Sequence, residues 1–372
     1  MSVIEFDSLL ATILVAVFLL AAVLGAVMRE TRFCTMGAVS DVVCVGDWMR
    51  MRQWALAIGV AMCGFSVLAY VGWVNPADIV YAMPQVIWLS ALVGGLLFGF
   101  GMVLASGCGA RNLTRLGGGS LKSLVVLVVL AVSAFATLKG ITSVPRARWF
   151  DSVNVTLSVP ALLPEWLAGK GWGAVADIRL WLGCGLGLVL VLLGLSAPRQ
   201  QRDWHVLMGG VLVGACVAAA WALSGHFGEV QEHPETLEHM YAATYTGRIE
   251  SFSFVAPVAH VLDWLLFFSD RSKVLTWGAV AVFGVVFGAF VQALVRREFR
   301  WQGFADTADL SRHLVGATLM GIGGVMALGC TVGQGISAVS ALQIASFIAI
   351  AAIIAGAVIA LRAQQWWLER QS

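Results

Sequence analysis

Apolar residues in this chain fall in long runs, and they do not show the spacing of an amphipathic soluble helix. Runs such as Leu9–Val27 and Leu121–Leu138 are close to the about 20 residues that a helix needs to cross a bilayer. We therefore expect an all-α integral membrane protein with about nine spanning helices. They are expected near residues 9–28, 53–73, 85–106, 121–138, 179–196, 204–223, 274–295, 313–328 and 340–361.

Two further apolar stretches, residues 33–46 and 250–268, are interrupted by small or polar residues, and the second contains Pro257. Both look too irregular to cross a membrane as one helix. Irregular backbone at membrane depth is tolerated only where it is buried in protein or lines a cavity. We interpret the two stretches as re-entrant or broken helices.

The chain contains an internal repeat. At a constant offset of 222 residues, nine of sixteen positions are identical between Val93–Cys108, with the sequence VGGLLFGFGMVLASGC, and Val315–Cys330, with the sequence VGATLMGIGGVMALGC. The repeated glycines would let helices approach closely in lipid. These glycines are residues 94, 99, 101 and 107 in the first copy and 316, 321, 323 and 329 in the second.

The number of spans between the two copies predicts that the halves are inverted. Four spans and one linking span precede the second half, so that half begins from the opposite side of the membrane. Inverted repeats recur in transporters, with the substrate site at the repeat interface. We divide the chain into a first membrane repeat (1–140), an external connector with one linking helix (141–203) and a second membrane repeat (204–372).

Lysine and arginine placement predicts a periplasmic N-terminus and a cytoplasmic C-terminus. The loop 74–84 has no Lys or Arg, and the loop 225–247 carries four glutamates, which suits the outside. Residues 139–178 run against this pattern, with four basic residues. Glu5 and Asp7 stand where a signal peptide would be basic, so the first run is expected to remain as an anchor. The expected cytoplasmic loops hold Arg29, Arg50, Arg52, Arg111, Arg115, Lys122, Arg199, Arg202, Arg296, Arg297 and Arg300.

Composition excludes several classes of protein. The chain is 59% hydrophobic and 12% charged, against roughly 25% charged in a soluble domain. Its net charge of +2 is spread thinly, which gives no nucleic-acid-binding patch. The seven cysteines lack CxxC spacing, which argues for free thiols and against a zinc site or disulfide framework. No phosphate-binding loop is found, and we expect no metal or cofactor.

Three short motifs combine a cysteine with a turn: Arg32–Ala38, Ser106–Asn112 and Gly329–Gly335. In the last two, the cysteine closes an apolar run and glycines follow at once. Glycine permits the turn and exposes backbone N–H groups. A helix starting near 121 or 338 would direct its positive end at the turn. Together these features favour an anionic substrate with a sulfur-compatible contact.

Each candidate residue also has an ordinary structural explanation. A buried membrane cysteine is more often a packing residue than a functional one, but the repeat favours function at Cys108 and Cys330. Arg111 could guide an anion or only anchor the loop, and Gln334 could donate to substrate or cap a helix. Asp41 is either an intramembrane carboxylate or a residue of the cytoplasmic surface. The candidate substrate path consists of Cys34, Cys108, Cys330, Gly107, Gly109, Arg111, Thr331 and Gln334.

The motifs RFCTMGA, SGC and GCTVGQG together resemble the YeeE/YedE family of membrane proteins, also called the sulfur-transport domain family. The resemblance covers nearly the whole chain. It implies an hourglass-like fold, thiosulfate uptake through the bacterial inner membrane, and a central constriction where cysteine thiols contact the substrate. Matched by motif, those cysteines are Cys34, Cys108 and Cys330. A cytoplasmic sulfur-accepting protein is a possible partner.

Other functions remain open from the sequence. The segment GARNLTRLGGGS after Cys108 resembles a family branch whose substrate is less settled, and other branches are associated with selenium. A membrane sulfurtransferase that forms a persulfide on Cys108 is a second alternative, although no histidine or acid lies at motif distance to activate the thiol. A non-catalytic scaffold would not explain the paired turns. We expect a transporter and not an enzyme.

Overall fold

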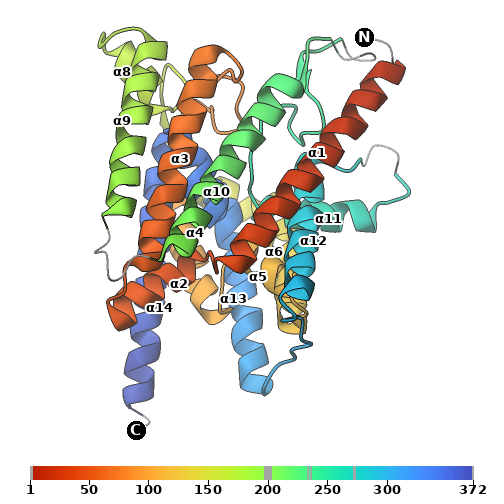
Figure 1. Ribbon diagram of the computed structural model, residues 1–372, viewed down its shortest axis with the longest axis vertical. Coiled ribbons are helices and arrows are strands. Elements are labelled where there is room, and N and C mark those ends of the chain that lie inside the picture. Colours follow the sequence, from red (N-terminus) through yellow and green to blue (C-terminus); the bar gives the residue numbers. More distant parts are fainter. Residues whose placement is uncertain (1–2, 197–202, 233, 235–236, 271–273, 371–372) are drawn as a thin grey trace.

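The computed structural model describes residues 3–196, 203–232, 234, 237–270 and 274–370. Long helices dominate it and run along one common direction (Figure 1). The N-terminus and the C-terminus lie at opposite ends of this bundle, which we call the N-side and the C-side. The long helices are α1 (Val3–Glu30), α3 (Met49–Val71), α4 (Trp88–Leu104), α6 (Leu121–Lys139), α9 (Val175–Leu195), α10 (Trp204–Ala222), α12 (Trp277–Val295), α13 (Thr307–Met326) and α14 (Ile344–Glu369).

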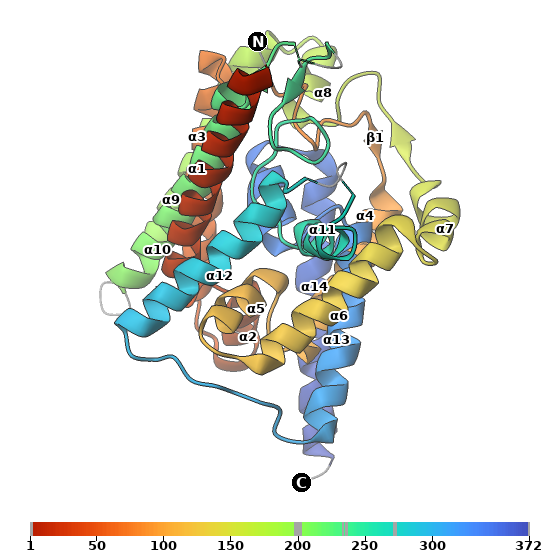
Figure 2. The same ribbon diagram turned by 90° about the vertical axis from the view of Figure 1, so that its right-hand side faces the viewer.

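The expectation of an all-α membrane protein is confirmed. Among the described residues, eight helical segments are long and apolar enough to cross a membrane. The ninth expected span, residues 313–328, falls on α13, which has 20 residues. Its first two turns carry Asp309, Arg312 and His313, and these polar residues lower its apolar character. They lie at the C-side end, where the chain enters from a loop (Figure 2).

The two interrupted stretches form short helices. The first contains α2 (Thr35–Ser40, six residues) and the π-helical segment η1 (Asp41–Val45, five residues). The second contains α11 (Val255–Leu266, 12 residues). Twelve residues extend about 18 Å, well short of the about 30 Å hydrocarbon core. Neither stretch can therefore cross the membrane alone.

Two more short helices follow the repeated cysteines directly. Helix α5 (Gly109–Gly117) begins after Cys108, and residues 331–340 are helical after Cys330, with the π-helical segment η5 (Gly333–Ala338) inside them. The sequence predicted helix starts near 121 and 338. Helix α6 does begin at Leu121, but the prediction missed α5 before it, and the start near 338 was wrong because that helix begins right after Cys330. The cysteines themselves end one helix and start the next, so no long loop separates them.

Glycines bring the repeated helices α4 and α13 into contact. A Cβ at Gly94 would lie 2.7 Å from the carbonyl oxygen of Gly323, and one at Gly323 would lie 2.6 Å from that of Gly94. Gly101 and Gly316 are related in the same way: a Cβ at Gly101 would lie 2.6 Å from the carbonyl oxygen of Gly316, and one at Gly316 would lie 2.7 Å from that of Gly101. Under the repeat offset of 222, Gly94 corresponds to Gly316 and Gly101 corresponds to Gly323. The contact Gly94–Gly323 is therefore equivalent to the contact Gly316–Gly101. The contact therefore has the two-fold character of inverted halves.

The remaining elements are short and lie mainly toward the N-side, where Figure 2 shows β1 and α8. Two antiparallel strand pairs join loops there, with Gln85 opposite Thr156 in one and Glu229 opposite Tyr241 in the other. The strands are β1 (Gln85–Val86), β2 (Val155–Thr156), β3 (Glu229–Val230) and β4 (Met240–Tyr241), and the short helices are α7 (Ser143–Pro145), η2 (Arg146–Asp151), α8 (Leu163–Gly169) and η4 (Leu223–Phe227).

Candidate functional site

The helices α1, α4 and α13 all end in the same kind of turn. In each, a residue other than glycine adopts the left-handed conformation: Arg32 (φ 52°), Ser106 (φ 56°) and Leu328 (φ 58°). The next amide then donates to the carbonyl five residues earlier, as in a Schellman motif. These bonds join Phe33 to Met28 (3.0 Å), Gly107 to Met102 (2.8 Å) and Gly329 to Gly324 (2.8 Å).

Gly107 and Gly329 occupy a backbone conformation that other residues rarely adopt, with φ of 157° and 156°. The space at Gly107 is also restricted, because a Cβ there would lie 3.0 Å from Arg111 Cγ. Both turns therefore require glycine. Gly109 differs, since its Cβ would meet only Leu130 Cδ1, at 3.9 Å.

Each turn delivers a cysteine to the start of a short helix. Cys34 precedes α2 and its sulfur accepts a hydrogen bond from the amide of Gly37 at 3.4 Å. Cys330 accepts from the amide of Gly333, also at 3.4 Å. Cys108 precedes α5 without such a bond. The thiols therefore lie beside the N–H groups at helix N-termini, which have no partner within their own helix.

Two of the three cysteines are in contact in the interior, and Thr331 links the third to them. Cys108 lies beside Cys34 on one side and the Thr331 hydroxyl on the other. Cys330, which directly precedes Thr331 in the chain, lies beside Ser253. Only 6% of Cys34, 2% of Cys108 and 0% of Cys330 is exposed. The polar side chains thus form a buried, connected row that runs from Cys34 to Ser253.

The hydroxyl of Thr331 is buried and forms no well-aligned hydrogen bond to any described residue. The same holds for Thr35, which follows Cys34 as Thr331 follows Cys330. A buried hydroxyl without a partner is costly. Both hydroxyls are therefore free to donate to an anion that enters the row.

Arginines gather on the C-side of the row. Arg111 and Arg50 are both close enough to Cys34 to act on it electrostatically. Arg115 has a structural contact, because it donates to the Ser106 carbonyl at 3.0 Å and so holds the cysteine turn. Arg111 forms no ion pair within the described part of the chain. Its guanidinium is therefore available to an anion.

Sequence reasoning missed the N-side end of the row. Tyr81 donates its hydroxyl proton to the Gly333 carbonyl at 3.2 Å, next to Cys330 and Ser253. The only available signal was positional, since Phe252 and Ser253 precede the broken helix α11 as Phe33 and Cys34 precede α2. In the adjoining N-side loop, burial raises the pKa of Glu250 to about 7. Its carboxyl therefore holds a proton more readily than an ordinary glutamate, which lowers its repulsion of anions.

Amide side chains fix the turns from within. Asn112 and Gln334 are equivalent under the repeat offset of 222. Asn112 donates to the carbonyls of Gly107 (3.0 Å) and Cys108 (3.1 Å), and Gln334 donates to the Leu328 carbonyl at 2.9 Å. Gln334 thus makes the capping contact that the sequence left as one of two alternatives.

The residues described here offer no group of three or more His, Cys, Asp or Glu that could hold a metal ion. Asp41, the uncertain carboxylate, is 25% exposed and pairs with Arg50 at 3.2 Å. It lines a pocket on the C-side. The donors along the row are therefore thiols, hydroxyls and guanidinium groups, which suit a small anion and not a cation.

The chain has relatives of known name. The sequence profile of the family described as "Sulphur transport" matches residues 30–359. The thiosulfate transporter TsuA of Escherichia coli strain K12 is 28% identical over 331 residues, which are 85% of this chain and 84% of that protein. The thiosulfate transporter TsuA of Spirochaeta thermophila is 23% identical over 332 residues, which are 87% and 90% of the two chains.

A third relative is the probable transporter YedE of E. coli strain K12, which is 33% identical over 84 residues, or 23% of this chain and 19% of that protein. The profile match spans the three cysteine turns and most of the helices. The resemblance inferred from the motifs is therefore confirmed, and the chain belongs to the sulphur transport family, YeeE/YedE, of multi-pass membrane proteins.

Proposed function

We propose that this protein carries thiosulfate, or a related small sulfur oxyanion, across the membrane along Cys330, Cys108 and Cys34. The observation that carries the proposal is the buried row, in which Cys34 lies beside Cys108 and Cys108 lies beside Thr331, the neighbour of Cys330 in the chain. Two relatives that share most of this chain's length are named thiosulfate transporters, which supports a sulfur oxyanion as the cargo.

Neutral thiols suit conduction better than strong donors. An ordinary thiol has a pKa near 8.5, so it is mostly protonated at pH 7 and donates weakly. A substrate held weakly at successive positions can leave each of them. Thr331, between Cys108 and Cys330, adds a hydroxyl donor at the crossing between the halves. The step is non-covalent and consumes no thiol.

We place the N-side in the periplasm and the C-side in the cytoplasm of a bacterial inner membrane. The support is the position of Arg50, Arg111 and Arg296 toward the C-side, as the positive-inside rule requires. Under this orientation the anion enters past Tyr81 and leaves past Arg111 and Arg50. A cytoplasmic sulfur-accepting protein would then receive the cargo at the C-side.

Uptake of labelled thiosulfate into proteoliposomes tests the role of the thiols. We expect Cys108→Ser and Cys330→Ser each to lower the initial rate by about tenfold or more, since the serine hydroxyl is smaller and hydrates more strongly. Cys184→Ser is the matched control, because Cys184 lies on α9, which packs against α3 and α8 and carries no residue of the row, and it should keep the rate. Wild-type uptake in both row variants would refute the thiol path.

The sulfurtransferase alternative makes a different prediction. In it, a Cys108 thiolate would attack the outer sulfur of thiosulfate, forming a persulfide and releasing sulfite. Intact-mass analysis after exposure to thiosulfate would detect the added sulfur atom, whereas transport leaves the chain unmodified. A competition panel of sulfite, sulfate, thiosulfate and selenium oxyanions in the same uptake assay would identify the cargo.

A further inference from the structure

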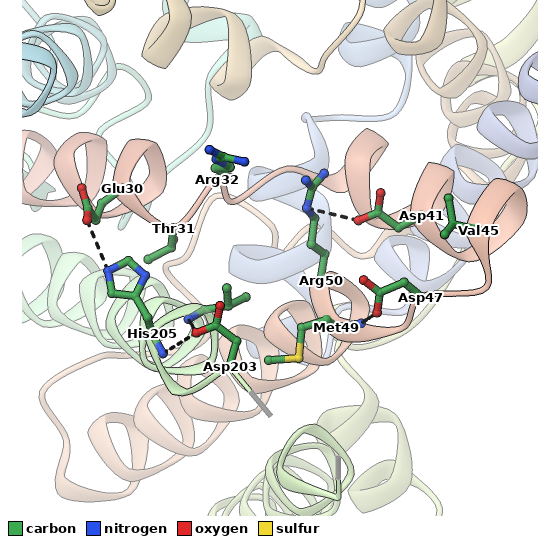
Figure 3. Close-up of a pocket in the computed structure, with 11 residues that line it drawn as sticks. Glu30, Thr31, Arg32, Asp41, Val45, Asp47, Met49, Arg50, Asp203 and His205 are labelled. Atoms are coloured by element: carbon green, nitrogen blue, oxygen red, sulfur yellow. Dashed lines mark hydrogen bonds and ion pairs between the residues drawn. The ribbon is translucent and has the colours of Figure 1, made fainter. Parts of the chain in front are cut away.

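A polar pocket opens on the C-side of the protein, close to Cys34. Its volume is about 430 Å³, and it lies between the end of α1, the broken helix α2–η1 and the starts of α3 and α10 (Figure 3). Both guanidinium groups of the pocket, those of Arg32 and Arg50, extend from the chain on the same side in this view. The pocket lies beside the row of thiols, and Arg32, the first residue of the motif Arg32–Ala38, lines it.

Most carboxylates of this pocket already have partners. Glu30 pairs with Arg296 and accepts from Gln292. Asp203 accepts from the amides of His205 (3.0 Å) and Val206 (3.3 Å) at the start of α10. Asp47 accepts from the amide of Met49 at 2.9 Å. The contacts that hold these three carboxylates involve groups other than Arg32 and Arg50.

The two arginines have only one carboxylate between them. Arg50 Nε lies 3.2 Å from Asp41 Oδ2, and the two side chains are 33% and 25% exposed. Arg32 makes no ion pair or side-chain hydrogen bond to any residue that the structure describes. The pocket therefore places two guanidinium groups beside the thiol row, one with a single carboxylate partner and the other with none among the described residues.

Arg50 connects the pocket to Cys34. Its guanidinium fills the space that a side chain at Gly37 would need, since a Cβ there would collide with Arg50 Nη1 and lie 3.6 Å from Cys34 Cβ. The amide of Gly37 is the donor to the Cys34 sulfur. An anion leaving Cys34 toward the C-side thus meets Arg50 next.

We propose that Arg50 and Arg32 form a release site for the sulfur oxyanion, in which Arg50 exchanges its partner Asp41 for the departing anion. The inference rests on the proposed transport function and adds a binding position to its path. A guanidinium binds an oxyanion as readily as a carboxylate, through paired N–H donors. Asp41 competes for the same donors, so the anion is held briefly and then displaced.

The backbone conformation of Arg32 allows a variant that removes its charge and should leave the backbone unchanged. Arg32 has a left-handed backbone conformation (φ 52°), which asparagine tolerates better than arginine. Arg32→Asn should therefore leave the turn intact and remove only the charge. Arg50→Gln removes the other guanidinium, and Asp41→Asn removes the competing carboxylate without a change of shape.

The test is equilibrium binding of labelled thiosulfate to the purified full-length protein. Arg32→Asn and Arg50→Gln should weaken binding by about tenfold each, the usual loss for a charged hydrogen bond. Asp41→Asn should tighten binding several-fold and slow turnover in proteoliposomes, because the anion no longer has a competitor. Arg312→Gln, an exposed arginine on α13 away from the pocket, is the control and should bind like wild type.

The affinity for thiosulfate should fall in the arginine variants and rise in Asp41→Asn, and these opposite changes distinguish a binding role from a structural one. If Arg50 and Asp41 only held the fold together, both substitutions would impair binding, and that result would overturn the release site. Wild-type affinity in Arg32→Asn and Arg50→Gln would overturn it as well. If Arg50→Gln does not fold, Arg32→Asn and Asp41→Asn still give opposite expected shifts. A wild-type protein that neither binds nor transports thiosulfate would instead refute the proposed function itself.

Discussion

At the scale of single residues, backbone conformation decides where the thiols lie. Arg32, Ser106 and Leu328 share one left-handed conformation, although their side chains have nothing in common. Each lies two positions before a cysteine. The shared turn relates Cys34 to the repeated pair Cys108 and Cys330, a relation that sequence identity alone did not reveal.

The two glycines beside Cys108 should respond differently to alanine. Gly107→Ala places a Cβ on a backbone with φ of 157°, and we expect a loss of about 1–3 kcal/mol in stability. Gly109→Ala meets only an atom at 3.9 Å, so stability should be nearly unchanged. Its methyl group would nevertheless narrow the space beside the thiol and lower thiosulfate uptake.

Thermal unfolding in detergent and uptake in proteoliposomes, measured on the same two variants, check this prediction. The expected pattern is a lower unfolding temperature for Gly107→Ala and a lower uptake rate at normal stability for Gly109→Ala. Unchanged uptake in Gly109→Ala would mean that the space beside this residue is not part of the path.

At the scale of elements, the protein uses short helices where a long one would block the interior. The helices α2, α5 and α11 and the segment 331–340 are all too short to span the membrane. They bring backbone N–H groups to membrane depth, which is tolerated only inside protein. The long helices α4 and α13 hold them in place through their paired glycines.

This packing gives a prediction for the glycine contacts. Gly323→Leu would place a side chain 2.6 Å from the Gly94 carbonyl oxygen and force α4 and α13 apart. We expect a loss of about 1–3 kcal/mol or more, as for other overpacked interiors, with poor recovery of folded protein. Gly185→Leu is the matched control, because a Cβ at this helical glycine of α9 meets nothing within 4 Å. Equal recovery of both variants in size-exclusion chromatography would contradict the contact.

At the scale of the whole molecule, two inverted halves give the protein two different faces. We propose that the C-side is cytoplasmic, and Cys44 allows a test because it is an exposed cysteine near Gln365 on that side. A membrane-impermeant maleimide should label Cys44 in inside-out vesicles and not in intact cells. Glu232→Cys in a Cys44→Ser background, on the N-side loop, should show the reverse. The opposite labelling pattern would reverse the proposed direction of transport.

Most of the scaffold and part of the site could be predicted from the sequence. The sequence predicted the membrane spans, the two broken stretches and the three cysteine turns. The starts of the short helices after Cys108 and Cys330 were not predicted, because no local sequence signal shows that Cys108 ends one helix and begins another. Tyr81 and Ser253 were missed because they reach the Cys330 turn from segments distant in the chain. Arg50 was predicted only as a loop residue, because its approach to Cys34 depends on how α2 folds back toward α3.

Hydrophobicity is a local property. The sequence by itself therefore determined that this is a membrane protein, about how many helices cross the membrane and where the helices are interrupted. The repeat is also local to two aligned windows, and it identified Cys108 and Cys330. Contact between Cys34, Cys108 and Thr331, and the approach of Arg50 to Cys34, were decided only by the tertiary structure. The contact of Cys108 with Thr331 joins positions 223 residues apart in the chain. These contacts depend on close helix packing at glycines such as Gly94 and Gly323.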